Sequence, residues 1–421
     1  MYKVSRFNLE KIINGEKMIY NSATKAFMKV RHDISVNDLL ELISNKDNQD
    51  TDIQALYSNG FIVETECDEI SRLKYVYNKK YFDSSDLNII LVPTLSCNFS
   101  CPYCFEAPYR QADQNPQYFE VLKKYAEKYF RYYKHVELSL FGGEPLLVVN
   151  DIMGFLEFTS ELSATHRFDY SCSIITNGSL LNRTIMDQLI KHKCQMMQIT
   201  IDGGIRTHDN YRKFHDGTPS FDLLINIINE VVGPYLIKND FSFILRFNLN
   251  NNEPAEIIDS LKLVNECYRK KISVFFRAVY NTETYNKINH NTSSDYDELM
   301  KCAKHLGYSI MYNQYYCRSC EACGDDNFFY ICPDLSIWKC INILSDDSKA
   351  KFGQINADGE MAINADNISN WYKAADCFSD PMCVACPLLP DCLGGCIYYK
   401  VNTNERLCSQ FNLTSLPFYY E

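Results

Sequence analysis

The chain has 421 residues, which exceeds one ordinary hydrophobic core, so two or three packed units are expected. Its 42 Lys and Arg residues stand against 53 Asp and Glu residues, and the net charge of −11 disfavours a nucleic-acid partner because phosphate backbones are repelled. No apolar run reaches the roughly 18 residues that cross a bilayer, and the N-terminus lacks the apolar core of a signal peptide. We therefore expect a cytoplasmic protein without a membrane or nucleic-acid partner.

The first 86 residues read as a small separate α+β unit. Two short β-prone runs, at 18–22 and 25–30, precede a helix at 36–43 that Ser35 caps. A second helix over 51–59 ends at Gly60, a residue that commonly follows the last turn of a helix. An extended run at 61–66 and a helix over 68–82 complete the unit.

Residues 87–310 alternate between strands and helices. The predicted strands are 88–94, 135–140, 171–176, 197–202, 242–248 and 272–279. The predicted helices are 118–133, 152–162, 180–192, 255–270 and 294–306. Such alternation indicates an α/β fold with a parallel sheet. Because six strands are too few for a closed barrel of eight, we expect a partial (β/α)6 barrel.

The cysteines are grouped in two places. The chain has 19, and the reducing cytosol argues against disulfides between them. Three lie within residues 97–104 and eleven within 317–408, whereas buried structural cysteines would scatter along the chain. The last part of the chain, 311–421, also has many turn residues and little periodicity, so we expect it to need bound metal to hold its structure.

The first group is a C-x3-C-x2-C motif directly after the first predicted strand, in LVPTLSCNFSCPYCFE. Cys97, Cys101 and Cys104 can ligate three irons of a cubane cluster and leave the fourth iron open for catalysis. The motif follows the carboxyl end of a parallel strand, where active sites of such sheets lie. A zinc site is the alternative, but no histidine lies between residues 34 and 134 to complete it.

A second motif, FGGEPLL at 141–147, follows the second predicted strand. Gly142 and Gly143 allow a backbone to approach a ligand closely, and the carboxylate of Glu144 suits an ammonium group. Taken alone, this motif would indicate only a turn.

Together the two motifs resemble those of the radical S-adenosylmethionine (SAM) superfamily. The resemblance implies a [4Fe–4S] cluster on the three cysteines and a 5′-deoxyadenosyl radical, made from SAM, that abstracts hydrogen from an unactivated position. It also implies a cellular reductant such as flavodoxin or ferredoxin. The implied SAM contacts are Tyr103, Gly142, Gly143, Glu144, Asn177, Thr200 and Arg212. Asp202 is a weaker candidate, since Asp202 and Arg212 can equally form a structural ion pair.

The second group resembles the SPASM domain of radical SAM peptide-modifying enzymes, through its spacing C-x2-C-x5-C-x3-C-x11-C from Cys383. The resemblance implies two auxiliary [4Fe–4S] clusters, three in all with the catalytic one. One set is Cys317, Cys323, Cys340 and Cys396; the other is Cys383, Cys386, Cys392 and Cys408. Cys320 competes with Cys317, zinc sites are an alternative, and Leu335 stands where the family usually has glycine.

The N-terminal unit resembles the winged-helix-like leader-recognition unit of peptide maturases, which binds a leader peptide as an added strand. The alternative is an accessory packing domain. The main functional hypothesis is therefore a maturase that installs a thioether or carbon–carbon crosslink in a ribosomally made precursor peptide. A sulfatase maturase, which oxidises Cys or Ser to formylglycine, is disfavoured because Ile341 and Asn342 stand where that family has an acidic base. A non-catalytic iron–sulfur electron carrier is the third hypothesis.

Overall fold

The chain divides into two compact units. The computed structural model describes residues 1–13, 15–39, 41, 50–83, 85–109, 115–249, 253–278, 293–311, 321–340, 348–406 and 408. Unit 1 contains Met1–Asp83, Gln314–Asp326 and Ile368–Glu421, and unit 2 contains Ser84–Asn313 and Asn327–Asn367. The cysteine-rich last part of the chain is thus divided between the units. The three-part division at residues 86 and 310 stays a prediction.

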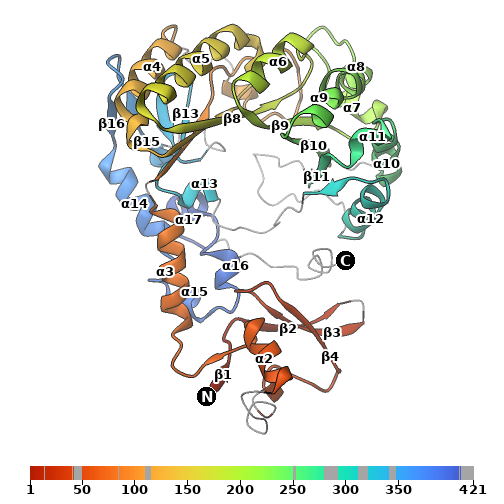
Figure 1. The fold of residues 1–421 in the computed structure, drawn as a ribbon, viewed down its shortest axis with the longest axis vertical. Helices are drawn as coiled ribbons and strands as arrows, with labels where there is room; N and C mark the ends of the chain where they lie inside the picture. The colour runs from red at the N-terminus through yellow and green to blue at the C-terminus, as the bar shows by residue number, and fades with distance from the viewer. Residues whose placement is uncertain are drawn as a thin grey trace. The chain divides into compact units, whose positions relative to one another are not determined.

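Unit 2 is built on one sheet, whose described strands follow the order β12-β11-β10-β9-β8-β7-β6-β13-β14-β15-β16 (Figure 1). The strands from β6 to β12 are parallel to their neighbours. They are β6 (Asp86–Leu91), β7 (His135–Leu140), β8 (Asp169–Thr176), β9 (Cys194–Ile201), β10 (Ser242–Leu249), β11 (Ile272–Ala278) and β12 (Ser309–Ile310). The predicted α/β fold with an open, mostly parallel sheet is confirmed, and each of the six predicted strands is present.

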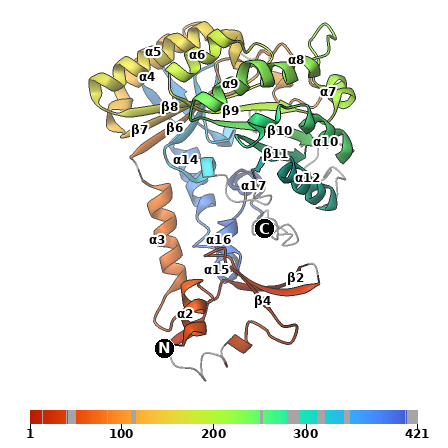
Figure 2. The ribbon, with the colours of Figure 1, turned by 45° about the vertical axis from the view of Figure 1, so that its right-hand side comes forward.

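The two faces of this sheet differ in character, because side chains alternate along each strand. One face carries fully buried apolar residues such as Leu138, Ile174 and Leu245, and helices cover the sheet on that side (Figure 2). The opposite face, here called the polar face, carries Ser139, Ser173, Gln198, Thr200, Arg246, Asn248 and Arg277. Cross-strand register places these residues on one side, with Ser139 beside Ser173 and Arg246 beside Thr200.

The helices of unit 2 agree with the predicted ones at 118–133, 152–162, 180–192 and 294–306. The described helices are α4 (Tyr118–Tyr129), α5 (Val149–His166), α6 (Arg183–Lys191), α7 (Ile205–Tyr211), α8 (Phe221–Asn226), α9 (Gly233–Lys238), α10 (Pro254–Lys262), α11 (Glu266–Arg269) and α12 (Ser293–His305). Short 3-10 helices are η1 (Ala107–Tyr109), η2 (Phe130–Tyr132), η3 (Pro145–Val148) and η6 (Ser348–Ala350), and η4 (Ile227–Val232) is a π-helix. The single helix predicted over 255–270 is wrong, because the backbone of Asn265 is extended between α10 and α11.

Four strands from the cysteine-rich part of the chain extend the sheet beyond β6. β13 (Phe328–Ile331) runs parallel to β6, and β14 (Ser336–Trp338), β15 (Lys351–Ile355) and β16 (Met361–Ile363) follow in antiparallel order. Apolar side chains of this extension, such as Ile337 and Phe352, are buried. Leu335 has a φ of 66°, a left-handed conformation that costs a residue with a Cβ about 1–2 kcal/mol. Glycine would adopt this conformation without that cost.

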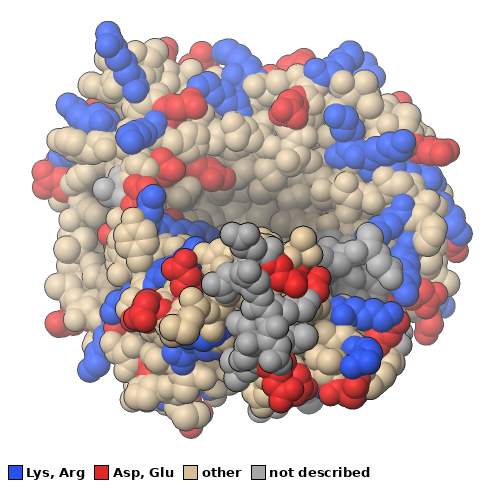
Figure 3. Space-filling view, turned by 60° about the horizontal axis from the view of Figure 1, so that its bottom comes forward, with Lys and Arg blue, Asp and Glu red and all other residues tan. Residues whose placement is uncertain are grey.

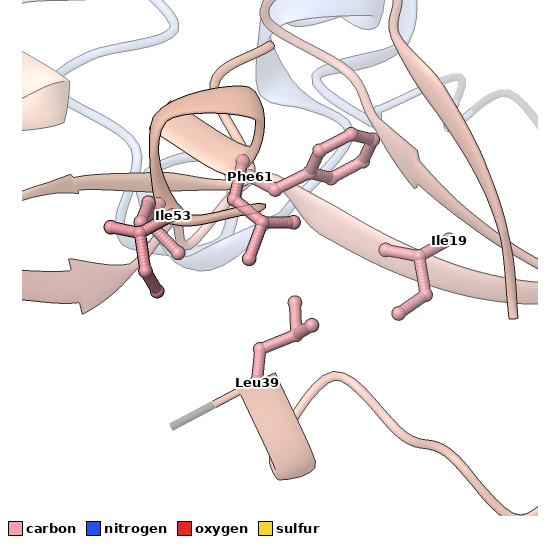
Figure 4. Packing of buried hydrophobic residues seen from close by; sticks show 6 residues of the cluster. Ile19, Leu39, Ile53 and Phe61 are labelled. Atoms are coloured by element: carbon pink, nitrogen blue, oxygen red, sulfur yellow. The ribbon is translucent and has the colours of Figure 1, made fainter. Parts of the chain in front are cut away.

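The N-terminal part of unit 1 contains two small antiparallel sheets and two described helices. β2 (Asn8–Ile13), β3 (Glu16–Asn21) and β4 (Phe27–Val30) form one sheet, and β1 (Tyr2–Val4) pairs with β5 (Ile62–Glu64) in the other. α2 (Thr51–Ser58) and α3 (Glu69–Tyr81) start at caps made by the Asp50 and Asp68 side chains. The hydrophobic core of this N-terminal part contains Ile19, Leu39, Ile53 and Phe61 (Figure 4). Residues 40, 42 and 43 of the helix predicted at 36–43 lie outside the described residues.

The last part of the chain completes unit 1 by packing onto this N-terminal part. It contains α13 (Glu321–Gly324), α14 (Ala365–Ala375), α15 (Pro381–Ala385), α16 (Leu389–Cys392) and α17 (Ile397–Thr403). Phe7, Cys377 and Leu389 form a shared buried cluster. The Asp391 carboxylate accepts a hydrogen bond from the Tyr20 hydroxyl at 2.9 Å and pairs with the Lys25 ammonium. None of the described helices is long and apolar enough to cross a membrane.

Candidate active site

The loop after β6 carries Cys97, Cys101 and Cys104, all partly exposed. Phe99 at its centre is fully buried and forms a β-bridge with Phe214. The Ser100 N–H donates to the Lys213 carbonyl at 2.9 Å, and the His215 ring lies 2.9 Å from the Cys97 carbonyl oxygen. Segment 213–215 therefore fixes the backbone of the loop while the three thiols stay accessible.

The turn after β7 contacts the same loop directly. The Gly143 N–H donates to the Thr94 carbonyl at 3.0 Å, and the Glu144 N–H donates to the Ser96 carbonyl at 2.8 Å. A Cβ on Gly143 would lie 2.2 Å from the Ser96 oxygen, and one on Gly142 would lie 2.5 Å from the Thr94 oxygen. The glycines thus permit close approach of the turn to the cysteine loop, and their contact with SAM stays a prediction.

Glu144 is fully buried, and its carboxylate is bonded to protein groups. It accepts hydrogen bonds from the Leu146 N–H at 3.0 Å, the Thr176 hydroxyl at 2.7 Å and the Asn177 N–H at 2.7 Å. Burial raises the pKa of Glu144 in spite of these bonds. The carboxylate therefore ties the end of β7 to the end of β8, a role the sequence did not indicate.

Through this bond Glu144 positions Asn177 beside the cysteine loop. The Asn177 side-chain amide lies 3.8 Å from the Cys97 sulfur and donates to the Asn98 side-chain oxygen at 2.7 Å. The Phe99 N–H also points to the Cys97 sulfur, at 3.4 Å. Donors aimed at a sulfur stabilise its thiolate form, which is the form that ligates metal.

Tyr103 joins the cysteine loop to the polar face. Its hydroxyl donates to Asp202 and accepts from the Arg212 guanidinium at 3.3 Å and from the Asn248 amide at 3.4 Å. The alternative of a direct Asp202–Arg212 ion pair is not found among the described residues, since the two side chains meet at this hydroxyl. Burial raises the pKa of both Tyr103 and Asp202.

Two atoms of this network are buried without a hydrogen-bond partner among the described residues: Asp202 Oδ1 and Arg212 Nε. Buried polar groups are normally paired, so an unpaired acceptor and an unpaired donor in one network are candidates for contact with a ligand. The oxygen suits an ammonium group and the guanidinium nitrogen suits a carboxylate. These two atoms therefore fit the ammonium and carboxylate groups of an amino-acid moiety.

His208 and Ser220, which the sequence analysis did not select, hold the backbone around this network. The Asp202 N–H donates to His208 Nδ1 at 3.1 Å, so the neutral ring carries its proton on Nε2 and donates to the Ser220 hydroxyl at 2.9 Å. That hydroxyl donates in turn to the Arg212 carbonyl. Burial, followed by the charge of Arg212, lowers the pKa of His208 well below its usual value.

The last cysteines of unit 1 lie in and between the short helices α15, α16 and α17. The Cys386 N–H donates to the Cys383 carbonyl at 3.0 Å, and burial raises the pKa of Cys383 to about 11, with smaller effects from Asp380 and Cys392. Between Cys392 and Cys396 the backbone is left-handed at three successive residues. The second of these is Gly394, where a Cβ would lie 2.8 Å from the Cys377 Cβ.

The other predicted auxiliary ligands are spread along the chain. Cys323 and Cys396 lie in unit 1, Cys340 lies in unit 2, and Cys317 and Cys320 lie outside the described residues, as do Ile341 and Asn342. Cys408 is exposed. In the described part of the chain no three His, Cys, Asp or Glu side chains are placed to hold a single metal ion. Both auxiliary ligand sets stay predictions.

The surface charge is mixed. On the face in Figure 3, the described Lys and Arg side chains lie among Asp and Glu side chains rather than in one basic area. This distribution agrees with the expectation of a partner other than nucleic acid, which stays a prediction.

Comparison with known proteins connects this geometry to a family. Residues 91–264 match the profile of the Radical SAM superfamily. The chain is 23% identical over 399 residues to the radical SAM cyclopropyl synthase TigE of Paramaledivibacter caminithermalis, covering 86% of this chain and 80% of that one. It is 26% identical over 185 residues to the AdoMet-dependent heme synthase of Methanosarcina barkeri, covering 44% of this chain and 48% of that one.

Solved structures agree on the fold. Streptococcus suis SuiB bound to precursor peptide SuiA superposes with a TM-score of 0.51 at 17% identity, covering 96% of both chains. Native anSMEcpe with bound AdoMet and Cp18Cys peptide superposes with a TM-score of 0.53 at 19% identity, covering 74% of this chain and 89% of that one.

The cysteine loop, the Gly142–Glu144 turn and the Tyr103 network all lie within the matched residues. The chain therefore carries a radical SAM domain over residues 91–264. Its likeness to TigE extends well beyond that domain, over most of the chain. A [4Fe–4S] cluster and SAM are the cofactors that this domain implies, and the prediction of the family is confirmed.

Proposed function

We propose that this enzyme is a cytoplasmic maturase of a ribosomally synthesised precursor peptide, in which it installs a thioether or a carbon–carbon crosslink. The observation that carries the proposal is that the similarity to SuiB, whose structure holds a precursor peptide, covers 96% of this chain and so includes both units. The likeness to a cyclopropyl synthase over 86% of the chain supports the same class.

The residues of unit 2 fit the cofactors. Cys97, Cys101 and Cys104 would hold the cluster, and Tyr103, Asn177, Thr200 and Arg212, with the Gly142–Glu144 turn, would surround SAM. The unpaired Asp202 oxygen and Arg212 nitrogen suit the ammonium and carboxylate of its methionine part. When bound, the cluster and SAM supply the radical that removes hydrogen from the peptide. The chain's own groups orient this site: Glu144 fixes Asn177, and His208 fixes Asp202.

Unit 1 would bind the leader peptide and take part in electron transfer. In the sheet β2-β3-β4, β2 and β4 are the edge strands among the described residues, and a leader peptide would add to such an edge. Cys383, Cys386, Cys392 and Cys408 would hold one auxiliary cluster. Cys317, Cys323, Cys340 and Cys396 would hold the other, and a flavodoxin or ferredoxin would supply electrons.

The direct test measures 5′-deoxyadenosine. Anaerobically reconstituted enzyme with SAM and dithionite should release it, and Cys101→Ala should abolish the release. Cys267→Ala is the matched control, because Cys267 is exposed on α11, outside the cysteine loop, and should leave release unchanged. Native protein should bind about twelve irons, four for each cubane cluster, and replacement of all three loop cysteines should leave about eight. Methyl transfer without 5′-deoxyadenosine, or about four irons in the native protein, would contradict the proposal.

A sulfatase maturase is the second candidate, favoured by the fold shared with anSMEcpe bound to a peptide. Incubation with a cysteine-containing sulfatase peptide, followed by an aldehyde-specific probe, separates the two. We expect no aldehyde, and its formation would replace the crosslinking proposal with formylglycine formation. An electron carrier without catalysis would give neither 5′-deoxyadenosine nor aldehyde.

A further inference from the structure

Two arginines on the polar face are not among the expected SAM contacts. Arg246 of β10 stands beside Thr200 of β9, and Arg277 of β11 stands beside Asn248, two residues further along β10. Paired positions in parallel strands share a face, and so do positions two apart in one strand. Both arginines therefore lie on the polar face in the carboxyl-terminal halves of their strands, toward the end where sheets of this kind bind ligands.

Arg246 is held in a fixed orientation. Its Nε donates to the Asn248 side-chain oxygen at 2.9 Å, and its guanidinium carbon lies 5.8 Å from the centre of the Phe275 ring. Its two terminal nitrogens have no hydrogen-bond partner within the part of the chain that the structure describes. The Nε edge and one flat face of the guanidinium group are thus occupied. Its two terminal nitrogens form the fork that can bind a carboxylate with two hydrogen bonds.

Two other arginines act on the charge of Arg246. Burial, followed by the charge of Arg277, lowers the pKa of Arg246 to about 10. The charged side chains that act on it most are Arg277, Arg212 and a single carboxylate, Asp202. Two guanidinium groups that repel each other in a partly buried site are unfavourable, and an added carboxylate would offset this repulsion. SAM carries a sulfonium, an ammonium and a carboxylate, so it is itself a net cation and adds no net negative charge.

We propose that Arg246 and Arg277 form a subsite for the carboxylate of an acidic residue in the peptide substrate. The subsite rests on the proposed function, because it needs a peptide on the polar face. The methionine carboxylate of SAM has the same chemistry, so the experiment has to separate the two sources.

Phenylglyoxal, which modifies guanidinium groups, provides a readout at each arginine. The reconstituted enzyme is labelled in the presence of SAM, of the capped peptide acetyl-Gly-Gly-Glu-Gly-Gly-amide, or of its Gln counterpart, and modification is quantified by mass spectrometry. A charge-assisted hydrogen-bonded pair worth about 1.4 kcal/mol corresponds to a tenfold change in a binding constant. The Glu peptide should therefore slow labelling of Arg246 and Arg277 about tenfold, and the Gln peptide should not. Arg31, whose side chain is 77% exposed, is the internal control.

Two outcomes overturn the proposal. Equal protection by the Glu and Gln peptides would exclude carboxylate recognition, and protection by SAM with no added effect of the Glu peptide would assign the arginines to SAM. Arg246→Gln should abolish the difference between the two peptides at Arg277, and Arg246→Lys should restore part of it. Release of 5′-deoxyadenosine by the wild-type enzyme tests the proposed function separately, so the two failures are distinguishable.

Discussion

Replacing His208 with asparagine should make unit 2 less sensitive to acid. The buried ring accepts from the Asp202 N–H and donates to Ser220, an arrangement that requires the neutral form. Protonation would replace the Nδ1 acceptor with a donor facing that N–H, and would bury a cation near Arg212. The pKa of His208 is therefore lower in the folded protein than its unfolded value of 6.5.

The magnitude follows from proton linkage. A histidine with a depressed folded pKa keeps its stabilising effect at high pH and loses it as pH falls through the unfolded value. Because the folded pKa lies well below the unfolded value of 6.5, lowering the pH from about 7.5 to about 5.5 costs up to about 1.4 kcal/mol of unfolding free energy. His208→Asn lacks this titration, so its disadvantage relative to wild type should shrink by about that amount over the same interval.

The two tryptophans allow each unit to be followed separately, since Trp338 lies in unit 2 and Trp371 in unit 1. In a Trp371→Phe background, urea unfolding monitored by fluorescence reports on unit 2. His166→Asn, at an exposed position at the end of α5, is the matched control and should follow the wild-type pH dependence. A constant difference between wild type and His208→Asn at both pH values would refute the linkage argument.

Three further predictions concern packing around the sites. Gly143→Ala places a methyl group 2.2 Å from the Ser96 oxygen, so it should displace the cysteine loop and lower bound iron from about twelve to about eight. Gly154→Ala is the control, because no atom lies within 4 Å of its Cβ, and it should leave the iron content unchanged. Glu144→Gln should destabilise unit 2 by about 1–3 kcal/mol in urea unfolding, because the amide turns a donor toward groups that need an acceptor; an unchanged midpoint would contradict the assigned bonds. Asp391→Asn should lower the stability of unit 1 by about 1–2 kcal/mol, because its bonds to Tyr20 and Lys25 become weaker. Trp371 fluorescence in a Trp338→Phe background follows this change, and an unchanged stability would show that these contacts contribute little.

The parallel strands were predictable because each reads as a short apolar run bounded by turn residues. β7 and β10 are examples, and both agree with the expected ranges within one or two residues at either end. The strands β13 to β16 were not predicted. They have three to five residues each, and turn residues and cysteines interrupt them. The pairing of β13 with β6 joins segments far apart in the chain, and such pairing leaves no local pattern in either segment.

The residues of the candidate site likewise divide into those that the sequence predicts and those that it does not. Cys97, Cys101 and Cys104 were selected by their spacing, and the glycines by their position after a strand. Single polar residues such as His208 and Arg246 have no spacing that marks them, and their roles follow only from what they contact in the folded chain. Glu144 was expected to face an ammonium group, yet it accepts bonds from Thr176 and Asn177.

The pairing of β13 with β6 also has a consequence for how the chain is made. A ribosome synthesises β6 long before it reaches residues 328–331, so during that interval the edge of β6 that later pairs with β13 is a row of unpaired N–H and C=O groups. Exposed edges of this kind pair readily with other chains. The nascent enzyme therefore passes through a state prone to aggregation, and a truncated chain that ends before β13 would remain in it. We expect chaperone binding during translation to concentrate in this interval.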